Sequence, residues 1–97
     1  MRTINWSQTA QNDYWENIDF LLHKWTENEA VHFIEEVEQV LNILKQGKVT
    51  FKPTDYRNTY QIIIVKQITL YYHINQNNEI ELLRFFNNLQ NPDKLNL

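Results

Sequence analysis

Residues 60–86, YQIIIVKQITLYYHINQNNEIELLRFF, decide the fold of this chain of 97 residues. The segment is dense in β-branched and aromatic residues, which favour strands, and polar residues interrupt it at 66–67 and at 75–78. Short turns at these two places join the strands into an antiparallel meander. We therefore predict three consecutive strands, at 60–65, 68–74 and 79–86.

The register of the last hairpin follows from the apolar pattern, because residues that pair across two strands share one face of the sheet. We expect four pairs: Ile74 with Ile80, Tyr72 with Leu82, Leu70 with Arg84, and Ile68 with Phe86. This register gathers the aliphatic side chains on one face, which we predict to be the core. The opposite face, which we predict to be the working surface, carries Thr69, Tyr71, His73, Glu81, Leu83 and Phe85.

The loop of this hairpin is centred on Gln76, Asn77 and Asn78. Such a tight hairpin needs a residue in the left-handed conformation, and the only glycine lies elsewhere, at position 47. Asparagine tolerates that conformation best among the remaining residues, so we expect one of these asparagines to adopt it.

The segment before the meander predicts a short strand at 2–6 and then a helix that begins after Ser7, a good N-cap residue. We expect Asp13, Glu16, Asp19 and Lys24 to face water. The apolar stripe of this helix, at spacings of three and four, comprises Trp6, Ala10, Tyr14, Ile18, Leu21, Leu22 and Trp25. Trp25 closes the stripe, and we expect it to be buried.

A second helix follows almost at once, because Thr26 and Glu29 have the spacing of a capping box. Gly47 suits the position after its last turn. With so short a link, the two helices must fold back as a hairpin. Its apolar stripe comprises Ala30, Phe33, Val37, Val40, Leu41 and Leu44.

Composition indicates a single domain, at residues 1–97, because the chain is too short for a second core. There is no cysteine, no apolar run like a signal peptide and no stretch of membrane-spanning length, so we expect a cytoplasmic protein that does not engage a membrane. The net charge of −3 is unevenly divided: residues 1–44 carry −6 and residues 45–97 carry +3. We therefore expect an acidic helical side and a mildly basic sheet side.

No motif of a phosphate loop, a metal-ligand cluster or a nucleophile elbow is present, so we predict neither a cofactor nor a bound metal. Of the three histidines, only His73 falls on the predicted working surface, beside Tyr71. The irregular connection 48–58 adds basic side chains, Lys48, Lys52 and Arg57, just before the meander. Loops commonly carry functional residues.

The order of strand, helical hairpin, basic loop, meander and Pro-containing tail resembles the RelE/ParE superfamily of type II toxin–antitoxin toxins over nearly the whole chain. The resemblance implies an α+β fold of the order β-α-α-β-β-β. It rests on five features in order along the chain: Trp6-Ser7-x-x-Ala10, Phe33-x-x-x-Val37, Arg57, Leu70-x-Tyr72, and 81–86 leading into Gln90-Asn91-Pro92.

This superfamily has two main activities. RelE-like members cleave messenger RNA on the ribosome with basic and aromatic side chains, whereas ParE-like members are associated with poisoning DNA gyrase. In the RelE-like pattern an arginine precedes the Leu-x-Tyr motif, but here Thr69 holds that place. A basic residue is also usual after the last strand, where this chain has Asn87, Asn88 and Leu89. A nuclease needs such cations beside the developing phosphorane.

The resemblance therefore favours a ParE-like toxin that acts on a macromolecular target and is neutralised by a cognate antitoxin in a hetero-oligomer. We expect the target and the antitoxin to contact Lys48, Lys52, Arg57, Tyr71, His73, Leu83 and Phe85. One alternative is a RelE-like ribonuclease with a displaced active site of Lys52, Arg57, Tyr71, His73 and Arg84. The other is a degenerate member that binds antitoxin without being toxic.

Overall fold

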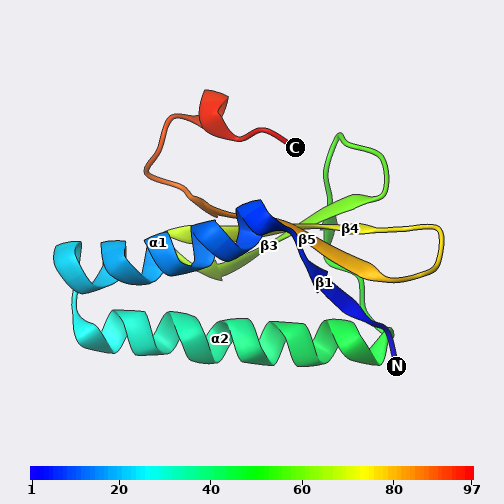
Figure 1. Cartoon of the computed structure of the whole chain (residues 1–97), viewed down its shortest axis with the longest axis horizontal. Helices are drawn as coiled ribbons and strands as arrows, with labels where there is room; N and C mark the ends of the chain where they lie inside the picture. The colour runs from blue at the N-terminus through cyan, green and yellow to red at the C-terminus, as the bar shows by residue number, and fades with distance from the viewer.

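The computed structural model describes all 97 residues of the chain and has the predicted α+β order. A helical hairpin lies against one face of a sheet, and the C-terminal tail returns on the other side (Figure 1). The elements are β1 (Ile4–Trp6), α1 (Gln8–Lys24), α2 (Glu27–Gln46), β2 (Lys52–Pro53), β3 (Thr59–Val65), β4 (Ile68–Ile74), β5 (Ile80–Asn87) and the 3₁₀ turn η1 (Pro92–Lys94).

The helix ends are capped as the sequence predicts. The Ser7 hydroxyl accepts a hydrogen bond from the Ala10 amide at 3.0 Å, and the Thr26 hydroxyl accepts one from the Glu29 amide at 3.2 Å. Gly47 ends α2 in the left-handed conformation, with φ of 72°. No helix of the chain is both long enough and apolar enough to cross a membrane.

The sheet has five strands in the order β1-β5-β4-β3-β2. The predicted meander forms its centre, and the Asn78 backbone, with φ of 61°, takes the left-handed conformation expected in the β4–β5 loop. The N-terminal strand pairs in parallel with β5, over residues 80–82 only. The two-residue strand β2, in a connection that we expected to be irregular, pairs with Tyr60 and Gln61 of β3.

The core lies between the helical hairpin and one face of the sheet. Phe33 and Leu44 of α2 are fully buried, as are Leu70 and Tyr72 of β4. The Tyr72 hydroxyl accepts a hydrogen bond from the Phe51 amide at 3.1 Å, which ties the α2–β2 connection to the sheet.

A bulge in β5 corrects the predicted register. The pairs Ile74–Ile80 and Tyr72–Leu82 are confirmed, but Leu83 is then left as an extra residue on β5. Beyond it, Leu70 pairs with Phe85 and Tyr71 with Arg84, and Ile68 pairs with Asn87, so the predicted pairs Leu70–Arg84 and Ile68–Phe86 are wrong. Arg84 consequently shares a face with Tyr71, and Phe85 enters the core, where it is 1% exposed.

Three expectations for the first helix are also wrong. Trp25 is 41% exposed rather than buried, because α1 ends at Lys24 and the non-helical backbone of Trp25 takes its side chain off the helical stripe. Leu22 is exposed as well. Asp13, which we expected to face water, is only 8% exposed, because its carboxylate bonds to β5.

Candidate functional site

The face of the sheet opposite the helical hairpin, hereafter the open face, brings several of the candidate residues into register. Because directly paired residues share a face, one row runs across four strands: Lys52, Gln61, Tyr71 and Arg84. At about 4.8 Å per strand, this row spans roughly 14 Å. A second row consists of Thr59, His73 and Glu81.

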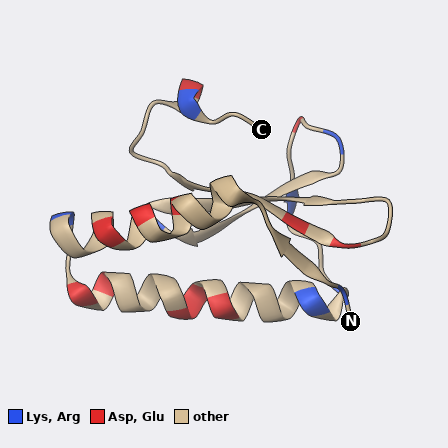
Figure 2. Ribbon diagram, in the orientation of Figure 1, with Lys and Arg blue, Asp and Glu red and all other residues tan.

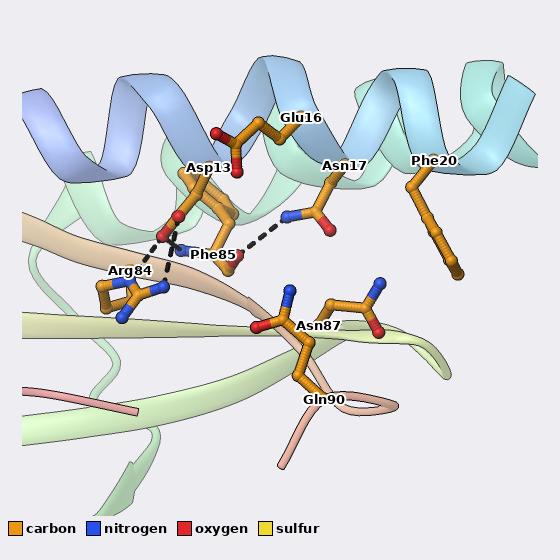
Figure 3. Close-up of a pocket in the computed structure, with 8 residues that line it drawn as sticks. All are labelled: Asp13, Glu16, Asn17, Phe20, Arg84, Phe85, Asn87 and Gln90. Carbon is orange, nitrogen blue, oxygen red and sulfur yellow. Dashed lines mark hydrogen bonds and ion pairs between the residues drawn. The ribbon is translucent and has the colours of Figure 1, made fainter. Parts of the chain in front are cut away.

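Arg84, at one end of the first row, is tied to α1 (Figure 3). Its Nε lies 2.6 Å from Oδ2 of Asp13 and its Nη2 lies 3.3 Å from Oδ1, in a bidentate ion pair whose side chains are only 16% and 10% exposed. Its Nη1 donates to the Lys94 carbonyl at 3.3 Å, and the guanidinium lies 5.7 Å from the Phe86 ring centre. The charge of Arg84 is thus already compensated within the chain.

Asp13 and Asn17 complete this corner from α1. Besides Arg84, Asp13 Oδ2 accepts a hydrogen bond from the Phe85 amide at 3.1 Å, and Asn17 Nδ2 donates to the Phe85 carbonyl at 2.8 Å. A small polar pocket of about 160 Å³ opens beside them (Figure 3). Its volume is well below the roughly 300 Å³ at which small-molecule sites begin. The eight residues around it are Asp13, Glu16, Asn17, Phe20, Arg84, Phe85, Asn87 and Gln90.

Tyr71 and His73 lie half-buried near the middle of the open face. Burial raises the pKa of the Tyr71 hydroxyl above its ordinary value, because water that would stabilise the phenolate is removed. Tyr71 therefore remains neutral near pH 7 and offers a hydrogen-bonding hydroxyl rather than a ready base. Thr69, at the place where RelE-like members carry an arginine, is buried, and its hydroxyl donates to Asn88 Oδ1 at 2.9 Å.

The basic residues of the 48–58 connection are not gathered into one cluster. Lys52 lies in β2 at the far end of the first row, and Arg57 lies in the turn before β3; both are exposed. Lys48 follows the C-cap of α2 and is also exposed, but it has no register position on the open face.

The last two candidates lie apart from the row. Leu83, the bulge residue, is half-buried and lines a hollow of about 320 Å³ together with Trp6 of β1 and Glu81. Phe85 packs in the core and offers no surface to a partner. No cluster of three or more histidine or acidic side chains is placed to hold a metal ion.

Asp13 and Asn17 are the site residues that sequence reasoning missed. The available signal is their spacing: both sit at helical positions within the buried stripe that runs through Ala10, Ile18 and Leu21. A carboxylate and a carboxamide in such a stripe need buried partners, because leaving them unpaired would be costly. That pattern alone predicts a polar contact across the core side of α1, although not its partner.

Comparison with known proteins identifies the class. The profile of the ParE toxin of type II toxin–antitoxin system, parDE, matches residues 4–92. No curated protein shows significant sequence similarity to the chain. This profile match places the chain in the RelE/ParE superfamily of toxins. Because the profile covers nearly the whole chain, the chain belongs to the ParE toxin family.

Solved structures share the fold at low sequence identity. A chromosomal ParDE TA system from P. aeruginosa aligns with a TM-score of 0.72 and 14% identity, covering 90% of this chain and 96% of that one. The YoeB dimer from Staphylococcus aureus aligns with a TM-score of 0.58 and 14% identity, covering 87% and 93%. A YoeB/ParE toxin from Agrobacterium tumefaciens gives 0.57 and 13%, covering 88% and 96%.

Proposed function

We propose that this toxin acts in the cytoplasm by binding its target, with DNA gyrase as the candidate, and that it does not cut RNA. One observation carries the proposal: Arg84, the only arginine in the two rows of the open face, is held by Asp13 and by the Lys94 carbonyl. Tyr71 and His73 are therefore left without a free guanidinium beside them.

The physical reason is the negative charge that develops on the phosphate in the transition state. Cleavage of RNA through its 2′-hydroxyl passes through a phosphorane, and a preorganised cation contributes about 10²–10³-fold or more to the rate of such a step. The predicted pairing of Leu70 with Arg84 would by itself have kept Arg84 off the face of Tyr71 and out of such a site, but that reason is wrong, since Arg84 does share the face of Tyr71. The reason that replaces it is neutralisation by Asp13.

The test uses two assays on the purified protein. Primer extension on messages in translating ribosomes should reveal no new ends, and gyrase supercoiling should be inhibited. Arg57→Ala should weaken the inhibition if the exposed loop contacts the target, while Lys24→Ala, an exposed cation at the end of α1, should not. Codon-specific cleavage that Arg57→Ala abolishes, with supercoiling untouched, would overturn the proposal.

The second candidate function is the ribonuclease, and the shared row of Lys52, Tyr71 and Arg84 favours it. Its active site would consist of these residues with His73 and Arg57. If ribosome-dependent cleavage is found, Tyr71→Phe and Lys52→Ala should each reduce it, because the first removes a hydroxyl and the second a cation. Absence of growth arrest in cells together with retained antitoxin binding would instead identify a degenerate member.

We also propose that a cognate antitoxin binds in a hetero-oligomer, across the sheet edge and the helical hairpin. Strand addition suits β3, because β2 pairs only with Tyr60 and Gln61 and leaves the outward backbone groups of residues 62–65 without a neighbouring strand. A hollow of about 390 Å³ beside it is lined by Phe51, Lys52, Gln61, Ile62 and Ile63. Co-expression with the product of a neighbouring short gene should restore growth. A complex whose partner touched neither surface would contradict this docking mode.

A further inference from the structure

Three aromatic side chains surround a hollow beside β1 and the first half of α1. The hollow has a volume of about 330 Å³ and is lined by Trp6, Gln11, Tyr14 and Trp15. The Tyr14 ring meets Trp6 edge-on at 5.3 Å and 82°, and meets Trp15 at 5.4 Å and 80°. Trp15 is 65% exposed, so one wall of the hollow is an open indole.

Elsewhere the chain supplies its own cations to aromatic rings. Lys66 Nζ lies 4.7 Å from the ring centre of Trp25, and the Arg84 guanidinium lies 5.7 Å from that of Phe86. No lysine or arginine lines the hollow at Trp15. The exposed Trp15 indole therefore has no cation of the chain's own beside it in the hollow.

The charge around the hollow favours such a cation. Asp19 lies four residues after Trp15 and so on the same side of α1, where it is exposed and forms no ion pair. Acidic residues are spread over both helices, and basic ones are confined to their ends (Figure 2). Residues 1–44 carry a net charge of −6, which repels a nucleic acid and attracts a basic polypeptide.

We propose that this hollow receives an arginine side chain of a partner protein, stacked on Trp15 with its guanidinium directed toward Asp19. The partner meant here is the antitoxin, so the inference rests on the proposed function. Arginine fits better than lysine, because its planar guanidinium is weakly hydrated and stacks on aromatic rings while it still bonds a carboxylate. An apolar side chain would fill the hollow but form no ion pair with Asp19.

The test titrates the ¹⁵N-labelled full chain with N-acetylarginine amide and follows the indole N–H signals of Trp6, Trp15 and Trp25. We expect saturable shifts at Trp6 and Trp15 but not at Trp25, and about fivefold weaker binding of the neutral isostere N-acetylcitrulline amide. Choline tests whether a small quaternary ammonium ligand is preferred. Trp15→Leu should abolish the response at Trp6, and Asp19→Asn should weaken binding about twofold.

The control is Trp25→Leu, which removes another exposed indole and should leave the titration unchanged. Equal binding of the citrulline and arginine amides, tighter binding of choline, or shifts that survive Trp15→Leu would each overturn the proposal. A response confined to Trp25, or no saturable response at all, would do so as well. Growth arrest by the unmodified toxin is scored separately, so failure of the proposed function remains distinguishable from failure of this site.

Discussion

The outer edges of β5 and β3, the two outermost long strands of the sheet, are covered to different extents. On β5, residues 80–82 pair with β1, and α1 covers the rest: Ser7 donates from its amide to the Leu82 carbonyl and from its hydroxyl to the Leu83 carbonyl, both at 3.2 Å. Asp13 and Asn17 then bond the Phe85 amide and carbonyl. On β3, the cover ends at Gln61.

This difference separates an edge that the chain closes itself from the edge to which we propose that the antitoxin adds a strand. Helix side chains take the place of a neighbouring strand along β5, so no partner can add there. The β3 edge keeps its outward backbone groups from Ile62 to Val65, and Ile63 on it is 66% exposed. An uncovered, apolar edge strand can pair with a strand from another chain. Binding of the proposed antitoxin as an added strand needs such an edge.

The largest expected effect is on the closed edge. Asp13→Ala should lower the free energy of unfolding by about 3 kcal/mol, because it strips the guanidinium of Arg84 of its counter-ion and leaves the Phe85 amide without an acceptor. Urea unfolding followed by circular dichroism measures the change. Asp19→Ala, on the exposed side of the same helix, should stay within about 0.5 kcal/mol of the parent. Equal values for the two variants would mean that α1 does not close this edge.

A smaller loss should follow Asn17→Leu, which keeps the volume of the side chain but removes its bond to the Phe85 carbonyl. The expected cost is about 1–2 kcal/mol, since a carbonyl that has lost its donor remains buried. The same unfolding measurement applies. Asn12→Leu, at an exposed position of α1, serves as the matched control, and a loss as large there would argue against a specific role for Asn17.

Sequence reasoning succeeded where a pattern repeats locally. Helix caps, the apolar stripe of α2 and the strands of the meander depend on residues close in sequence, and they were predictable from Ser7, Thr26, Gly47 and the β-branched run. The first two hairpin pairs follow from the same periodicity. The placement of Tyr71 and His73 on one face required only the alternation of a strand.

What could not be predicted depends on contacts between distant segments. The bulge at Leu83 places Phe85 in the core and leaves Arg84 facing outward, where the Asp13 carboxylate, 71 positions away in the chain, meets it. A regular period of two contains no sign of an inserted residue. The exposure of Trp25 likewise arises from the backbone at a helix end, which spacing does not determine.

A substitution at the β3 edge should weaken antitoxin binding without lowering stability, whereas substitutions at the β5 edge lower stability. Ile63→Lys should leave the unfolding free energy within about 0.5 kcal/mol of the parent, because the side chain is already exposed, yet weaken antitoxin binding at least about tenfold by placing a charge on the pairing edge. Calorimetric titration with the antitoxin measures the affinity. Leu89→Lys, equally exposed but in the tail, should bind like the parent. Unchanged affinity in Ile63→Lys would place the antitoxin elsewhere.

The smallest effect concerns the end of the open edge, where Lys66 follows β3 and lies over Trp25. Burial of Trp25 would make Trp25→Ala cost about 3–5 kcal/mol, as for a core aromatic residue. The ring is partly exposed, so the loss should instead be about 1 kcal/mol, from the cation–π contact and limited packing. Phe33→Ala, which removes a fully buried ring from α2, should cost the full 3–5 kcal/mol in the same urea series. An equal loss of unfolding free energy in Trp25→Ala and Phe33→Ala would mean that the β3–β4 turn is anchored to the helical hairpin as firmly as β5 is anchored to α1. The two edges would then differ only in backbone pairing.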